Sequence, residues 1–152
     1  MKMKSDKINF DIREMSISDY SELIDLWESI EGLCVDEEDS YENMITFLKR
    51  NKGLSYVAII ESNIVAAIKG AQDGRRGYIS HLAVLPQFRG LGIAKILYDK
   101  TLQELKNQGI WKCNLYVLNS NINALDFWQY NGWKELENNF KMLQKNMRNT
   151  KS

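Results

Sequence analysis

The sequence predicts an α+β fold in which a mixed β-sheet is flanked by helices. Segments with the two-residue alternation of strands occur between segments with the 3.6-residue periodicity of helices. One apolar strand-like run, 78–85, leads through a glycine-rich turn into a helix-like run that reaches Gln108. The chain of 152 residues has one proline and no internal repeat, which favours a single domain with one core.

The first third of the chain predicts one strand and two helices. Residues 8–12 alternate between apolar and polar, which is the pattern of a half-buried strand. Ser18 is a candidate N-cap of the first helix. The apolar face of that helix carries Leu23, Leu26, Trp27 and Ile30. An acidic loop, 36–39, leads to a second helix for which Ser40 is the candidate cap.

Three strands and their turns follow. The runs 54–60 and 64–70 lie on either side of Glu61-Ser62-Asn63, a hairpin turn by composition. A second turn, 72–77, precedes the strand 78–85. Pro86 marks the end of that strand, because proline cannot donate to a strand ladder.

The rest of the chain predicts a helix, a strand, a second helix and two short terminal strands. Gly109 is well placed to cap the C-terminus of the long helix. A fifth strand over 111–118 and a helix over about 123–130 come next. The complete predicted order is β-α-α-β-β-β-α-β-α-β-β.

The turn over 87–94 has the features of an anion-binding site. The first turn of a helix leaves backbone N–H groups without partners, and the helix dipole favours negative charge there. Gly90 and Gly92 remove the side chains that would keep a diphosphate from those groups, and Arg89 adds a cation. The sequence therefore predicts a cradle for the pyrophosphate of a nucleotide-bearing cofactor.

Two common phosphate-binding motifs do not match this turn. A Walker loop needs a Lys-Ser/Thr pair, which nothing here supplies. A dinucleotide fingerprint needs Gly or Ala at its sixth position, where this chain has Lys95. The run 111–118 also ends without the acidic residue that would bind a ribose.

The motif that does match is Gln/Arg-x-x-Gly-x-Gly/Ala, here Gln87, Gly90 and Gly92. It resembles the central motif of the GNAT superfamily of N-acetyltransferases. Leu82 to Pro86 resembles the family's fourth strand, and Asn121-x-x-Ala124 followed by Gly132-Trp133 resembles its closing signature. The chain looks most like the compact bacterial branch that includes ribosomal-protein N-terminal acetyltransferases.

This resemblance covers residues 8–145 and implies a mostly antiparallel sheet, with acetyl-CoA as cosubstrate and no metal. Backbone amides of the turn would hold the pyrophosphate, and the fourth strand would pair with the pantetheine arm. Asn121 would bond that arm, and the helix after it would border the cofactor. The assigned cofactor-binding residues are Leu82, Ala83, Val84, Gln87, Phe88, Arg89, Gly90, Leu91, Gly92, Ile93, Ala94, Asn121, Ala124 and Phe127.

The catalytic residues depart from the family pattern. Many relatives place a tyrosine general acid four residues before the Gly-Phe pair, and this chain has Trp128 there. An indole N–H donates hydrogen bonds but is a poor proton source. Trp128 could therefore stabilise the sulfur of coenzyme A by a hydrogen bond but not protonate it. For the base, His81 has a suitable side-chain pKa, near ~6.5 in the unperturbed residue. Tyr116 lies where some protein N-terminal acetyltransferases carry a glutamate.

Each catalytic candidate also has a purely structural interpretation. His81 could be a hydrogen-bonded core or surface histidine, and Tyr116 a β-favouring aromatic on a sheet face. Trp128 and Phe127 could simply be core. The acidic loop 36–39 could be a solvated loop or could attract a cationic amine.

Composition excludes several classes of function. Twenty basic and twenty acidic side chains cancel, so no global field recruits nucleic acid or an anionic membrane. No apolar run approaches the ~20 residues that span a bilayer. Two cysteines suit a reducing compartment and match no metal site, so we expect cytoplasmic residence. We expect flexible tails at 1–7 and 146–152 around one acetyltransferase domain, 8–145.

The leading hypothesis is an acetyl-CoA-dependent N-acetyltransferase in which a primary amine attacks directly in a ternary complex. The acceptor is an amine-bearing small molecule or protein, and it could be cationic if the acidic loop lines the acceptor site. The alternative is a non-catalytic sensor module that binds acyl-CoA. Family members are often dimers, so a homodimer stays open.

Overall fold

The computed structural model describes residues 9–136 and 140–148. The tail expected over 1–7 lies outside the described residues, as does the tail over 146–152 except for 146–148. The chain forms two compact units, Met1–Tyr116 and Val117–Ser152, and each is described by itself. No helix in the described part of the chain is long and apolar enough to cross a membrane.

The first unit contains a five-stranded sheet whose strand order follows the chain order. Neighbouring strands are antiparallel except the last pair, which is parallel. This confirms the predicted α+β class and the mostly antiparallel mixed sheet. The strands are β1 (Asp11–Glu14), β2 (Tyr56–Ile60), β3 (Asn63–Gln72), β4 (Gly77–Val84) and β5 (Cys113–Asn114).

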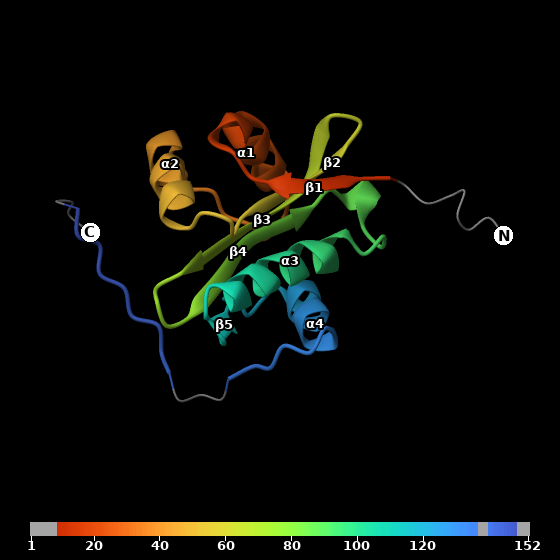
Figure 1. The fold of residues 1–152 in the computed structure, drawn as a ribbon. Coiled ribbons are helices and arrows are strands. Elements are labelled where there is room, and N and C mark those ends of the chain that lie inside the picture. The colour runs from red at the N-terminus through yellow and green to blue at the C-terminus, as the bar shows by residue number, and fades with distance from the viewer. Residues whose placement is uncertain (1–8, 137–139, 149–152) are drawn as a thin grey trace. The chain divides into compact units, whose positions relative to one another are not determined.

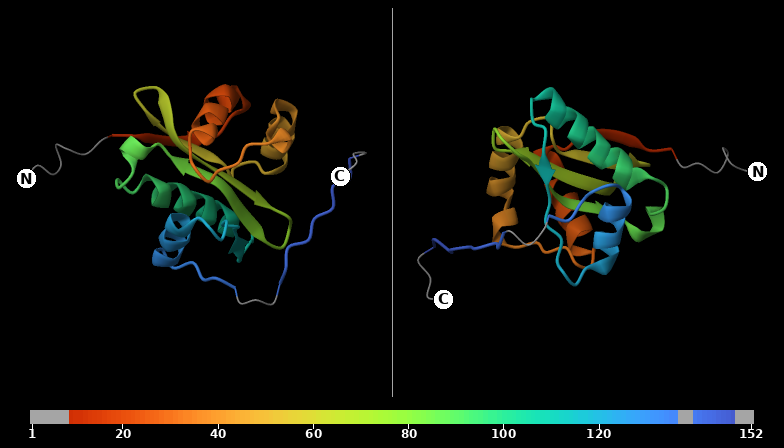
Figure 2. Two further views of the ribbon diagram at one scale, coloured as in Figure 1. Left: turned by 180° about the vertical axis from the view of Figure 1, so that it is seen from behind. Right: turned by 90° about the horizontal axis from the view of Figure 1, so that it is seen from below.

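Helices cover both faces of this sheet. α1 (Tyr20–Glu28) and α2 (Tyr41–Arg50) lie on one face, and α3 (Ile93–Asn107) lies on the other (Figures 1 and 2). The second unit contains α4 (Ile122–Tyr130). Helix and strand positions agree with the sequence prediction up to α3 within a few residues.

Local side-chain chemistry sets the helix starts. Ser40 caps α2 as predicted, since its hydroxyl accepts from the backbone N–H of Asn43 at 3.2 Å. The predicted cap at Ser18 is wrong. Ser16 and Asp19 form a reciprocal capping box around a short 3-10 turn, and α1 continues from that turn.

Hairpin geometry follows from two residues with positive φ. Glu61 and Ser62, at φ 50° and 70°, form the two-residue loop between β2 and β3. Turns of this kind match the right-handed twist of the paired strands. The hairpin predicted here is confirmed.

The core has a cluster on each face of the sheet. Trp27, Leu23 and Met44 are fully or almost fully buried on the α1 and α2 face. On the α3 face the helix comes so close that a Cβ at Gly70 would collide with the Leu54 carbonyl oxygen and with Thr101 Cγ2, at 2.7 Å. Alternation along β3 therefore sends residue 69 toward α1 and α2, and residue 70 toward α3.

The predicted fifth strand over 111–118 is too long. β5 pairs with β4 only at Gly77–Cys113 and Tyr78–Asn114. A strand lasts only where its backbone groups have partners, and β4 bulges three residues later.

The two terminal strands are also not found in residues 131–136 and 140–148. Five large apolar side chains in these segments are exposed, unlike the side chains on the buried face of a strand. They are Leu136, Phe140, Met142, Leu143 and Met147.

Candidate active site

The turn between β4 and α3 has the backbone geometry of an anion site. Residues 86–88 form one 3-10 turn, after which Gly90 and Gly92 adopt φ of 80° and 82°. Gly92 is the N-cap of α3, and no side chain of the described residues caps that helix. The N–H groups of the first turn of α3 are therefore open to a ligand.

Space for that ligand is present at both glycines. A Cβ built on Gly90 or Gly92 would have no heavy atom within 4 Å. Glycine is needed at both positions by the left-handed backbone, and it leaves the approach to the amides clear. Arg89 is exposed, and its Nε donates to the Val84 carbonyl at 3.0 Å, which ties the turn to the end of β4. These features fit a diphosphate.

β4 leads from this turn back to a bulge. His81 and Leu82 lie opposite the single residue Ile68, and His81 has φ of 54°. Such a conformation is uncommon for a residue other than glycine and persists only where the surroundings enforce it. Beyond Tyr78, β4 has no strand partner on its β5 side within residues 9–116. Backbone groups along that edge can therefore pair with an extended ligand.

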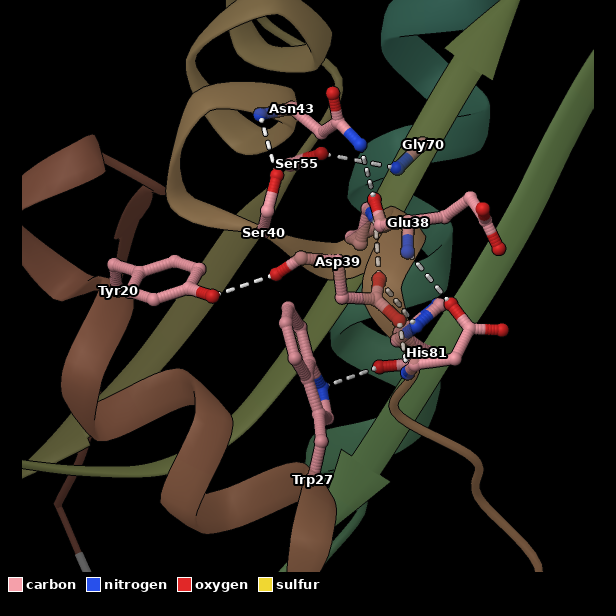
Figure 3. Close-up of polar contacts among 11 residues, drawn as sticks. Tyr20, Trp27, Glu38, Asp39, Ser40, Asn43, Ser55, Gly70 and His81 are labelled. Atoms are coloured by element: carbon pink, nitrogen blue, oxygen red, sulfur yellow. Dashed lines mark hydrogen bonds and ion pairs between the residues drawn. The ribbon is translucent and has the colours of Figure 1, made fainter. Parts of the chain in front are cut away.

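His81 is held from two sides. The Trp27 indole N–H donates to the His81 backbone carbonyl at 3.0 Å (Figure 3). The Trp27 and His81 rings meet edge to face, with centroids 4.8 Å apart. Trp27 is completely buried, so it fixes both the bulge and the imidazole.

A buried carboxylate and a buried ammonium complete the surroundings of the imidazole. Asp39 Oδ1 lies 3.2 Å from His81 Nε2 (Figure 3). The same oxygen lies 3.6 Å from Lys69 Nζ. The Lys69 and Asp39 side chains are only 10% and 8% exposed. Lys69 Nζ also lies 4.3 Å from the centre of the Phe47 ring.

The electrostatics of this cluster keep His81 neutral. Burial lowers the pKa of His81 below its ordinary value, and the nearby Lys69 ammonium lowers it further. Asp39 and Asp36 oppose this pKa shift but do not reverse it. Burial likewise lowers the pKa of Lys69, although the nearby Asp39 carboxylate raises it. A neutral imidazole at neutral pH is in the form that accepts a proton.

Comparison with known proteins identifies the family and the fold. The model of the acetyltransferase (GNAT) family matches residues 20–133. The chain belongs to the GNAT family. An acetyltransferase of Sodalis glossinidius is 33% identical over 111 residues, 73% of this chain and 78% of that protein. An acetyltransferase of Photorhabdus laumondii is 35% identical over 113 residues, 73% and 77% of the two chains.

A solved GNAT structure has the same fold. It is PaiA N-acetyltransferase from Thermoplasma acidophilum in complex with coenzyme A, with a TM-score of 0.71 and 23% identity. The match covers 84% of this chain and 91% of that chain. The family match and the two relatives show that the present chain is an acetyltransferase, and thus an acyltransferase enzyme.

Three other predicted site residues, Tyr116, Trp128 and Asn121, lie outside the cluster around His81 that the structure describes. Tyr116 is 73% exposed, lies beyond the end of β5, and has no described contact with His81. Trp128 is buried in the second unit, with its ring 5.1 Å from Phe127 and 5.0 Å from Trp133 between centroids. Asn121 caps α4, since its Oδ1 accepts from Ala124 N–H at 3.2 Å.

Sequence reasoning missed two members of the cluster around the imidazole. Asp39 was predicted only as part of an acidic loop, and Lys69 was not singled out. The available signal was a lone lysine inside an otherwise apolar strand run, 64–70. A charged residue at a buried strand position usually has a partner.

Proposed function

We propose that this chain transfers the acetyl group of acetyl-CoA to a primary amine by direct attack in a ternary complex, with His81 as the base. The observation that carries the proposal is the course of β4. This single strand joins a buried, neutral imidazole to an open edge and then to an uncapped helix N-terminus. A base, a binding edge and an anion site thus follow one another along the chain.

The proposed cofactor contacts start at the helix N-terminus. Amides of residues 88–94 would receive the pyrophosphate, and Leu82 to Val84 would pair with the pantetheine arm. A backbone N–H on that strand would also face the carbonyl oxygen as charge develops on it. Asn121, Ala124 and Phe127 are proposed to border the arm from α4. When bound, acetyl-CoA supplies an activated acyl group.

Proton transfer is the task of the protein's own side chains. A cationic acceptor first loses one proton to solvent, because only the neutral amine has the lone pair that attacks. The neutral nitrogen then forms a bond to the acetyl carbon and the carbon–sulfur bond breaks. The second proton that nitrogen loses goes to His81, directly or through one water molecule. The sulfur leaves as thiolate or takes a proton from water, since its pKa is near the ~8.5 of a cysteine thiol. Trp128 is proposed only to steady the sulfur, and Tyr116 to line the acceptor side.

The proposed acceptor is a cationic amine. The short 3-10 turn Glu37–Asp39 follows Asp36 and carries the acidic loop next to His81. Negative charge there would concentrate amines such as polyamines, aminoglycosides, or the N-terminus and lysines of a protein.

The test is release of free thiol from acetyl-CoA in the presence of spermidine, lysine, kanamycin and a peptide with a free N-terminus. We expect thiol release that depends on at least one amine and is lost in His81→Ala. If the protein bound acetyl-CoA but none of the four amines caused thiol release, the non-catalytic sensor would be favoured instead. Absence of coenzyme A binding to folded protein would remove both interpretations.

A further inference from the structure

The cluster around the His81 imidazole also contains Asp39 and Lys69, which come from two other elements. Asp39 is the last residue of the 3-10 turn between α1 and α2, and Lys69 lies on β3. Asp39 is fixed independently of His81, because its Oδ2 accepts from the backbone N–H of Asp36 at 3.1 Å. Its carbonyl also accepts from the Tyr20 hydroxyl at 2.7 Å (Figure 3). The carboxylate is therefore positioned before any ligand binds.

We propose that Asp39 and Lys69 are positioning residues for His81: Asp39 holds the imidazole proton on Nε2, which leaves Nδ1 as the atom that accepts the proton from the amine. This inference rests on the proposed function, because only there is His81 the base.

The tautomer follows from hydrogen-bonding capacity. An ionised carboxylate only accepts, so an imidazole nitrogen 3.2 Å from Asp39 Oδ1 is stabilised when it carries a hydrogen. A neutral imidazole has one N–H, and its other nitrogen keeps the lone pair. With the hydrogen on Nε2, the lone pair belongs to Nδ1. The ring is not aligned for a linear bond to Asp39, so the contact is electrostatic in this structure.

Lys69 sets the strength of the base. It faces the same carboxylate oxygen as His81, at 3.6 Å, so it offsets part of the negative charge that the imidazole experiences. Without Lys69, burial alone would oppose the rise in the pKa of His81 that Asp39 and Asp36 cause. The lysine thus adds to burial in keeping the imidazole neutral and able to accept a proton near neutral pH.

The surroundings of the two ring nitrogens are consistent with this role. Both are buried without a hydrogen-bond partner in the described residues, although the side chain is 19% exposed, and Nε2 is the one that lies 3.2 Å from Asp39 Oδ1. With the hydrogen on Nε2, Nδ1 is an unsatisfied acceptor. An unsatisfied buried acceptor is unfavourable, and native structures keep few of them. A substrate amine or one water molecule would satisfy it.

The chain has one histidine, which permits a direct test without a known acceptor. Protein labelled with ¹⁵N-histidine, without an affinity tag, gives the signals of one imidazole. At neutral pH we expect Nδ1 at the downfield position of a bare imidazole nitrogen and Nε2 at the upfield position of a protonated one. The opposite tautomer in the wild-type protein would overturn the proposal without any variant.

Two substitutions should move the His81 titration midpoint in opposite directions. Asp39→Asn removes a charge that raises the pKa of His81, so the midpoint should fall and the tautomers should mix. Lys69→Met removes a charge that lowers the pKa of His81, so the midpoint should rise while the tautomer stays the same. Glu42→Gln and Lys49→Met, both exposed on α2, are controls with the same charge changes. They should leave both signals in place.

Kinetics with an amine found in the thiol assay supply the second readout. Asp39→Asn should lower kcat by about 10- to 100-fold, part of the ~10²- to 10⁴-fold that a general base contributes. Lys69→Met should move the acidic limb of kcat/KM to higher pH. The positioning roles would be refuted if, in an active enzyme, the two variants shifted the pH midpoint of His81 in the same direction or did not shift it. The proposed function would then still stand. An inactive wild-type protein would refute the proposed function and with it the role of His81 as base, whatever tautomer the ¹⁵N signals show.

Discussion

Substitution of Gly92 by alanine tests ligand binding at the turn separately from overall stability. Its φ of 82° is left-handed, and a Cβ there would meet no protein atom within 4 Å. Gly92→Ala should therefore destabilise the free protein only through its backbone, by about 1–2 kcal/mol. For a chain of this length that corresponds to a fall in Tm of about 2–4 °C per kcal/mol. The new methyl group would, however, stand where a diphosphate approaches the amides of α3.

Gly109 provides a matched control at the other end of the same helix. It has φ of 85°, and its Cβ position is equally open. Gly109→Ala should lose the same ~1–2 kcal/mol of stability but bind coenzyme A normally. Gly92→Ala should raise the Kd for coenzyme A at least ~10-fold, equivalent to about 1.4 kcal/mol.

The assay pairs thermal unfolding with calorimetric titration of coenzyme A into each variant. If Gly92→Ala bound coenzyme A as tightly as the wild type, the turn would not be the pyrophosphate site. Equal loss of affinity in Gly109→Ala would mean that general helix destabilisation, rather than the added methyl group, weakens binding.

Three further predictions concern the site and its support. His81→Ala should lower kcat ~10²- to 10⁴-fold and abolish the acidic limb of the kcat/KM profile, whose midpoint in the wild type should lie below the ordinary histidine pKa of ~6.5. Because burial lowers the pKa of His81 in the folded state, the unfolded chain binds the extra proton, so stability in urea should decrease as pH falls from ~6.5 toward the folded-state pKa. His81→Ala should remove that part of the pH dependence, and an unchanged pH slope would contradict the burial argument. Gly70→Ala should lower the free energy of unfolding by about 1–3 kcal/mol, because Thr101 Cγ2 would lie 2.7 Å from the new methyl carbon, and urea denaturation that leaves the midpoint unchanged would contradict the packing. Trp27→Phe removes the donor to the His81 carbonyl and should cost about 1–3 kcal/mol while shifting the imidazole ¹⁵N signals, whereas unchanged signals would mean that Trp27 does not fix the ring.

Much of the fold could be predicted from local signals. The hairpin at Glu61 and Ser62, the cap at Ser40 and the glycine turn before α3 each depend on residues close together in sequence. The prediction failed where strand-like composition was not matched by pairing. The run 111–118 has that composition, but it pairs with β4 only at Cys113 and Asn114, and composition does not show where two distant segments stop being paired.

By itself the sequence determined the glycine turn before α3, since left-handed glycines and a helix start are properties of a few consecutive residues. Only the tertiary structure decided what surrounds His81. Asp39, Lys69 and Trp27 come from three separate elements, and their charges and hydrogen bonds act on the imidazole only after the sheet and helices pack. Burial then strengthens these interactions, because little water remains to screen them. No local pattern of residues encodes that environment.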